Sequence, residues 1–209
     1  MLKFILFYLI IIVSISDAQF IKSYGFKAGM TNSGEEWNYK DDEIGDFKKD
    51  PKIGLNISGF AEFLDIPFLN LVAEIGYNQK GMKEKVLFAA AADGSGELKT
   101  VTNRVDYIDL SLAVKLNYAL PLITPYVFAG PRIDVLVGSD VDPGHKIVYD
   151  DYEKLVYGLK IGLGSEIGNI LPLSVLAEFQ YNYDLSDAYK TEYLKINNNS
   201  FEFKLGIIL

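Results

Sequence analysis

VDYIDLSLAVKLNYALPLITPYVFAGPRIDVLVG, residues 105–138, contains two long runs of alternating apolar and polar residues joined by a short turn at Pro121. Successive side chains of a strand point to opposite faces, so each run has one apolar and one polar face. One face of the first run carries Ile108, Leu110, Leu112, Val114, Leu116 and Tyr118, and the other carries Tyr107, Asp109, Ser111, Ala113, Lys115 and Asn117. The stretch therefore predicts an amphipathic β-hairpin.

The same alternation recurs along the chain. Besides the two runs of the hairpin, it predicts strands over residues 24–31, 52–63, 69–80, 155–166, 174–184 and 200–209. The connections alternate between long polar loops and short turns, and the short turns are Ile66-Pro67-Phe68, Leu120-Pro121-Leu122 and Leu171-Pro172-Leu173. Residues 81–104 contain an Asp93-Gly94 turn signal, which predicts that the flanking strands continue as a protruding hairpin. The fold class expected is all-β, an eight-stranded antiparallel up-and-down transmembrane β-barrel.

Composition limits the possible partners. The 209 residues fit one domain, and a hydrophobic content of 49% with 14 Tyr, 13 Phe and 18 Gly suits a membrane barrel. A net charge of -8 excludes nucleic acid as a partner, because phosphate binding requires a basic surface. The absence of Cys excludes disulfides, thiolate metal sites and thiol nucleophiles.

Residues 1–18 have the pattern of a cleaved signal peptide. Lys3 provides the positive charge, an apolar run follows, and Ser16 and Ala18 are small residues at a cleavage site. The apolar run is shorter than the roughly 20 residues that a membrane helix needs. We therefore expect a signal peptide at 1–18 and the barrel domain at 19–209.

Charge placement indicates which face of the strands points outward. The polar faces of the predicted strands carry Lys27, Glu62, Glu74, Asp109, Lys115, Arg132, Asp134, Lys160, Glu166, Glu178, Glu202 and Lys204, whereas the apolar faces carry no charge. With the charges facing lipid, the cost would be about 2–4 kcal/mol for each midplane Lys or Arg. These charges are therefore expected to form an ion-pair network inside the barrel. A secreted lipocalin-like barrel with an apolar interior and a small apolar ligand is the alternative.

Two further expectations concern single features. Pro131 interrupts a strand in a barrel that has no edge, so a bulge or missing ladder pairing is expected at Gly130-Pro131. The long loops are expected outside the cell and the short turns in the periplasm. Trp37 and Tyr39, in the predicted first loop, are the candidates for contact with a partner, and packing within that loop is the alternative.

Three segments together resemble the outer-membrane β-barrel domain family of small PorT-like proteins from Gram-negative Bacteroidota and their relatives. They are Gly76-Tyr77-Asn78-Gln79-Lys80-Gly81, Tyr107-Ile108-Asp109-Leu110 and Pro125-Tyr126-Val127-Phe128-Ala129-Gly130-Pro131. The resemblance implies an outer-membrane location, partners in outer-membrane lipid and the assembly machinery, and in some members a link to secretion and cell-surface machinery. The chain departs from the common pattern of such barrels by ending in Leu209 rather than an aromatic residue.

No enzyme, cofactor or metal site is predicted. His145 is the only His, and although acidic residues surround it, it lies beside Pro143-Gly144 in a polar loop without a distinctive Ser motif. Asp140-Val141-Asp142 lacks the continuation of a calcium loop, so solvated charge is expected there. An interior filled by side chains is expected rather than a narrow ion-conducting pore, because eight strands leave little more than room for side chains. Another envelope protein is a further candidate partner.

Overall fold

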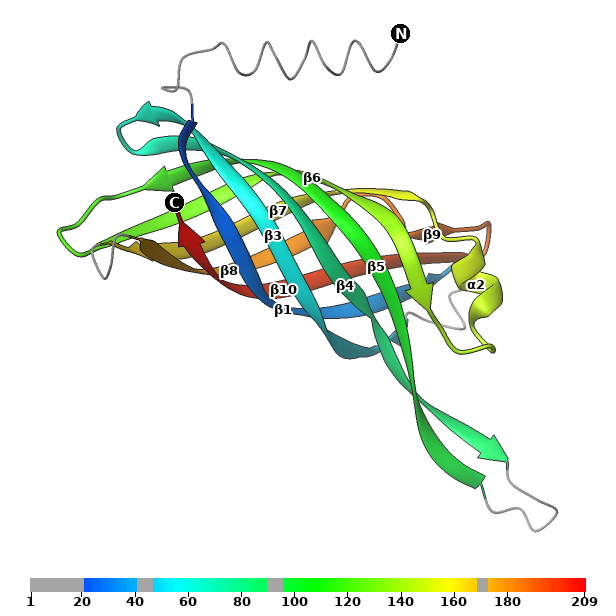
Figure 1. Ribbon diagram of the computed structural model, residues 1–209. Helices are drawn as coiled ribbons and strands as arrows, with labels where there is room; N and C mark the ends of the chain where they lie inside the picture. The colour runs from blue at the N-terminus through cyan, green and yellow to red at the C-terminus, as the bar shows by residue number, and fades with distance from the viewer. Residues whose placement is uncertain (1–20, 41–46, 90–95, 169–172) are drawn as a thin grey trace, which may run out of the picture.

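Eight long antiparallel strands form a hydrogen-bonded ring in the computed structural model, which describes residues 21–40, 47–89, 96–168 and 173–209 (Figure 1). The order around the ring is β1-β3-β4-β5-β6-β7-β8-β10, and β1 pairs with β10 to close it. The strands are β1 Ile21–Tyr39, β3 Asp50–Ile66, β4 Leu69–Ala89, β5 Gly96–Asn117, β6 Ile123–Asp140, β7 Leu155–Ile167, β8 Ser174–Asp184 and β10 Leu194–Ile208. The predicted eight-stranded barrel is confirmed.

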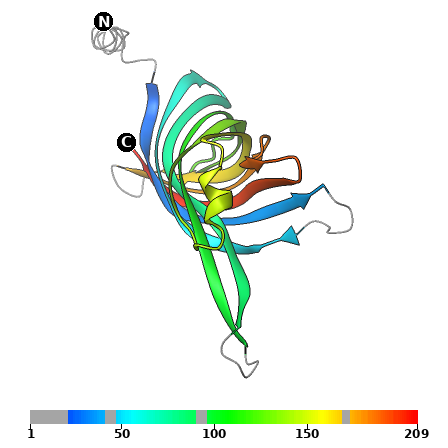
Figure 2. The ribbon, with the colours of Figure 1, turned by 90° about the vertical axis from the view of Figure 1, so that its right-hand side faces the viewer.

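Three short elements accompany the ring. They are strand β2 (Phe47–Lys48), which pairs with β1, strand β9 (Tyr189–Lys190), which pairs with β10, and helix α2 (Lys146–Asp150). Figure 2 looks along the barrel and shows α2 in front of the ring at the end where the long connections lie. No helix in the described part of the chain is both long and apolar enough to span a membrane.

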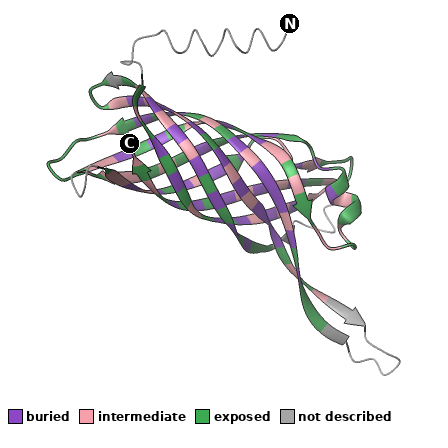
Figure 3. Ribbon diagram, viewed as in Figure 1, coloured by how far each residue is buried: buried purple, intermediate pink, exposed green. Residues whose placement is uncertain are grey.

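Burial alternates along most of the ring, which Figure 3 shows as stripes of buried and exposed residues, and the alternation is interrupted at residues 80–82 and 105–107. Large apolar side chains point outward, among them Phe26, Ile75, Leu112, Ile161 and Phe203. Lys, Glu, Asp, Asn and Gln side chains occupy the buried positions. The alternative of a soluble barrel with an apolar interior is therefore wrong, because polar groups fill the inside and the exterior requires a hydrocarbon environment.

Strands β1 and β10 continue beyond the band of outward-facing apolar residues. On the outward face of β1 the apolar residues end at Met30, and Asn32, Gly34, Glu36 and Asn38 follow although the strand continues to Tyr39. Residues 33–39 and 194–199, which the sequence pattern assigned to loops, are therefore strand. The apolar–polar alternation of the sequence ends there because the outward face of this segment carries polar residues, but backbone pairing between β1 and β10 continues to Tyr39↔Leu194.

Connections at the two ends of the ring differ in length, as predicted. Pro67 and Phe68 alone separate β3 from β4, and Phe68 has a φ of 70° in this tight turn. At the opposite end β4 and β5 continue as a hairpin that pairs out to Ala89↔Gly96, which confirms the predicted protruding hairpin. The predicted signal peptide and the turn at Leu171-Pro172 lie outside the described residues.

Pro131 interrupts one ladder without changing its register. Between β5 and β6, pairing is present at Ser111↔Arg132 and resumes at Val114↔Ala129 with the same offset. On the other side, Pro131 pairs normally with Leu159 of β7. The predicted loss of ladder pairing is confirmed on the β5 side, and no residue is inserted there, so the strand is not bulged at this position.

Candidate functional site

Charged side chains from the strands of the ring meet inside the barrel. Of the twelve charges predicted from the sequence, eleven are buried and Glu166 is half-buried. The buried ones are Lys27, Glu62, Glu74, Asp109, Lys115, Arg132, Asp134, Lys160, Glu178, Glu202 and Lys204. We call this set, with the groups it binds, the interior network.

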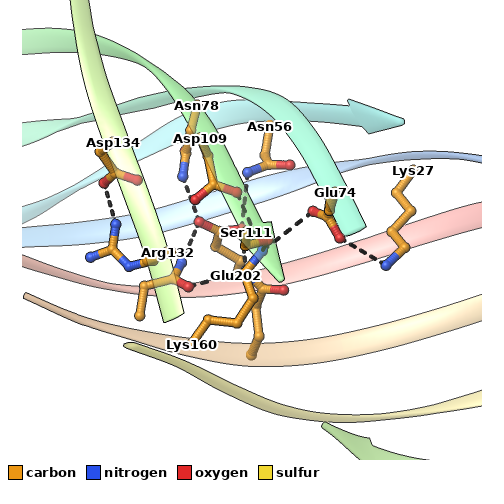
Figure 4. A network of polar contacts seen from close by, with 12 residues as sticks. Lys27, Asn56, Glu74, Asn78, Asp109, Ser111, Arg132, Asp134, Lys160 and Glu202 are labelled. Carbon is orange, nitrogen blue, oxygen red and sulfur yellow. Dashed lines mark hydrogen bonds and ion pairs between the residues drawn. The ribbon is translucent and has the colours of Figure 1, made fainter. Parts of the chain in front are cut away.

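Glu74 of β4 lies at the centre of the interior network (Figure 4). Its carboxylate is 2.7 Å from Lys204 Nζ, 3.0 Å from Lys27 Nζ and 3.6 Å from Lys160 Nζ. Lys27 also binds Glu178 at 2.8 Å. Because these residues belong to five different strands, the contacts cross the barrel interior and tie its walls together.

Glu202 of β10 is the second centre of the interior network, and side-chain amide groups donate most of its hydrogen bonds. Asn56, Asn78, Gln180 and Asn182 donate hydrogen bonds to its carboxylate at 2.9, 2.5, 2.8 and 2.6 Å. Lys204 Nζ lies 3.1 Å away. The donors on β3 and β4 come from strands two and three places away from β10 around the ring, so the side chain of Glu202 reaches across part of the barrel interior.

Two further groups of ion pairs lie above and below these centres. Toward the long loops, Arg132 binds both Asp134 and Asp184, and Lys80 Nζ is 2.7 Å from Asp134. Toward the short turns, Lys115 binds Glu62 at 2.5 Å and also binds Glu166. Burial makes each of these charges costly without its partners, so the pairs depend on one another.

Small residues leave room for the large interior side chains. A Cβ placed on Gly162 would lie 2.4 Å from the ring of Phe128, and one on Gly164 would lie 2.5 Å from the ring of Tyr126. The cavity among Lys27, Glu74, Lys115 and neighbouring groups has a volume of about 10 Å³. A single water needs roughly 10–15 Å³, so this part of the barrel is filled by side chains.

A different cluster closes the barrel at the long-loop end. Its buried apolar and aromatic members are Trp37, Met82, Val105, Tyr107, Tyr149, Tyr152, Val156, Ala188 and Ile196, and we call them the mouth cluster. Trp37 lies in strand β1 and not in the predicted first loop, and it is only 6% exposed, with its side chain directed inward. Tyr39 is half-buried and packs against the same cluster.

Glu35 is buried within the mouth cluster and binds neutral donors. Tyr149 of α2 donates from its hydroxyl at 2.9 Å, and Trp37 donates from Nε1 at 3.1 Å. No ion pair joins Glu35 to any described residue within 4.0 Å, and Lys49 acts only through its more distant charge. Burial raises the pKa of Glu35 from 4.5 to about 7, and the hydrogen bonds only partly oppose this shift.

His145 is not the solvated loop residue that the sequence suggested. Its Nε2 lies 3.2 Å from Glu84, and its ring meets Trp37 edge-on at 6.2 Å between centroids. The imidazole therefore packs on the outside of the mouth cluster. Within the described ranges, no three His, Asp or Glu side chains are grouped so that they could hold a metal ion.

Sequence reasoning missed three charged groups of these sites. Lys80 and Asp184 belong to the interior network, and both have the same period-two phase as the predicted members of their strands. Extending that phase to the strand ends would have identified them. Glu35 lay in a predicted loop, and only the continuation of β1 places it inside.

Comparison with known proteins identifies the chain's relatives. A family model described as an outer membrane protein beta-barrel domain matches residues 18–190. A comparison with curated proteins finds no match. Among solved structures, OprG from Pseudomonas aeruginosa is 10% identical with a TM-score of 0.51, covering 90% of this chain and 95% of that chain. Neisserial surface protein A is 13% identical with a TM-score of 0.47, covering 88% and 96%. At these identities the similarity concerns the fold.

Proposed function

We propose that this chain, which belongs to the outer membrane protein beta-barrel domain family, is a non-conducting and non-enzymatic barrel whose long loops contact another component of the cell envelope. The filled interior is the observation that carries the proposal. The interior network occupies the middle of the ring, the cavity beside Glu74 holds about 10 Å³, and the mouth cluster covers the long-loop end. An anchored surface for binding is the role that such a barrel supports best.

The partners follow from the surfaces. Outward apolar side chains such as Phe26 and Phe203 would contact outer-membrane lipid, and insertion would depend on the outer-membrane assembly machinery. The resemblance of three segments to small PorT-like barrels supports a secretion-associated or cell-surface role within this proposal. A protein of the envelope would then be the partner of the long loops.

The proposal requires the long loops to lie outside the cell and the short turns to lie in the periplasm. The chain has no Cys, so single cysteines report location without background. Leu98→Cys tests the protruding hairpin, and Leu122→Cys, in the turn between β5 and β6, is its matched control because both side chains are exposed. A membrane-impermeant maleimide is expected to label position 98 on intact cells and position 122 only after the outer membrane is opened. The reverse pattern would contradict the proposed orientation.

A further inference from the structure

The hairpin of β4 and β5 leaves the barrel as a two-stranded ribbon (Figures 1 and 2). β3 pairs with β4 as far as Asp50↔Lys83, and β6 pairs with β5 as far as Arg104↔Asp140. Beyond these points, residues 84–89 and 96–101 pair with each other from Glu84↔Val101 to Ala89↔Gly96. In the part of the chain that the structure describes, no third strand pairs with either edge of this ribbon.

Each edge of the ribbon therefore has backbone N–H and C=O groups that point into solvent. Six residues of β4, 84–89, extend for about 20 Å at 3.4 Å per residue, which is the length of an average strand. A two-stranded ribbon is only marginally stable alone, and a third strand would supply the missing ladder. An open edge of this kind is the template on which an extended segment of another protein adds a strand.

Charge distinguishes the β4 edge from the β5 edge. Lys83 and Lys85 are exposed on one face of the ribbon, opposite the exposed Thr102 and Thr100 of β5. Glu84 points to the other face, where it binds Lys49 at 2.5 Å. Asp50 of β3 lies opposite Lys83 where the pairing of β3 ends, so Lys85 is the described cation on this face of the free part of the edge. Glu84, on the other face, already binds Lys49 and His145.

We propose that the β4 edge of the ribbon, residues 84–89, binds an extended acidic segment of a partner protein by β-strand addition. The added strand would continue the ladder where β3 departs at Asp50, and a carboxylate on it would lie beside Lys85, with Lys83 diagonally adjacent. Opposite charges on neighbouring strands stabilise a ladder, and like charges destabilise it. A second copy of this chain would bring two sets of these lysines into one short ladder, so a different, acidic protein is the favoured occupant. The proposal rests on the external orientation given under Proposed function.

The test uses the full-length protein in detergent micelles and two synthetic ten-residue peptides. One alternates Glu with Thr and Val, and the other has Lys in place of each Glu. The Glu peptide is expected to bind and to slow hydrogen exchange of the backbone amides in residues 84–89. The Lys83→Glu/Lys85→Glu variant is expected to bind the Glu peptide at least tenfold more weakly and to bind the Lys peptide instead. Lys190→Glu/Lys195→Glu, which reverses two exposed lysines on another hairpin, is the matched control and should change binding less than twofold.

Three results would overturn the proposal: equal binding of the two peptides, binding that leaves the amides of 84–89 unprotected, or ribbon-to-ribbon crosslinking of two copies in place of peptide binding. Failure here is distinguishable from failure of the proposed orientation. Labelling of Leu98→Cys on intact cells does not depend on any peptide, so external labelling without peptide binding would reject only the docking of an acidic strand.

Discussion

The interior network and the mouth cluster both bury acidic groups, but they stabilise them in different ways. Glu74 lies within 3.6 Å of three lysines, in the segment that lipid surrounds. Glu35, at the same burial, binds a tyrosine hydroxyl and an indole N–H beyond the apolar band. The first arrangement compensates charge with charge, whereas in the second the hydrogen bonds come from neutral groups and no described cation lies within 4.0 Å of the carboxyl group.

The interior network and the mouth cluster are therefore suited to different roles. Buried ion pairs that cross the ring make every member dependent on its partners, so the side chains of this part of the barrel hold one another in place. Burial without a nearby cation raises the pKa of a carboxyl group toward neutral pH. The stability of the mouth cluster should therefore depend on pH.

Loss of a central cation should damage the interior network severely. Arg132→Leu removes the partner of Asp134 and Asp184 and leaves only Lys80 near them. Breaking a buried pair costs about 3–5 kcal/mol, and we expect a loss of that size in the free energy of unfolding measured in lipid vesicles with urea. Arg104→Leu is the matched control, because Arg104 is 40% exposed in its pair with Asp106. Its expected loss is below about 1 kcal/mol, and equal losses would show that the interior pairs are not special.

Glu35 should give the mouth cluster a pH dependence that the interior network lacks. Its pKa is 4.5 in the unfolded chain and about 7 in the folded protein. Below pH 4.5 the carboxyl is neutral in both states and the cluster has its full stability. As the pH rises from 4.5 to about 7, the unfolded chain loses the proton first, so stability falls, by about 3 kcal/mol in total, and then levels off.

Trp37 makes this change measurable, because it is the only Trp and it donates to Glu35. Its fluorescence should follow urea unfolding of the mouth at each pH. Glu35→Gln is the control, since an amide of the same shape does not titrate over this range. A wild-type protein whose stability changes with pH in parallel with that variant would exclude Glu35 as the origin of the dependence.

A smaller effect is expected from Tyr149→Phe. The change removes the hydroxyl that joins α2 to Glu35 at 2.9 Å and keeps the aromatic ring, which stacks on Tyr152. A hydrogen bond to a charged acceptor contributes about 1.5–3 kcal/mol, so the loss should be largest above pH 7 and smaller at pH 4.5. Tyr193→Phe, at a position that is 71% exposed, is expected to be neutral. A loss that does not vary with pH would mean that Tyr149 acts only through its packing.

The sequence was most informative where lipid covers one side of the sheet. In that band the alternation of apolar and polar residues is imposed by two different surroundings, and the faces of Phe26 and Lys27 or of Leu112 and Ser111 follow directly. The missing pairing beside Pro131 could also be predicted, because proline has no N–H to donate.

Beyond the band the same reasoning failed for a physical reason. Residues 33–39 have polar side chains on the outward face, so their periodicity resembles a loop, although backbone pairing with β10 continues. Glu35 and Trp37 were therefore not recognised as interior residues. Their partner Tyr149 lies 114 residues from Glu35 in α2, and no local pattern predicts a contact at that separation.

Conductance across a planar lipid bilayer measures directly whether side chains close this barrel. The purified full-length protein, inserted from detergent, is expected to give no single-channel steps at either polarity, at pH 5 or at pH 8, because the interior network remains filled when the mouth cluster changes with pH. Arg132→Leu and Lys204→Met, which shorten charged side chains of the interior network, provide the comparison under the same conditions. Reproducible steps from the wild-type protein would contradict the account.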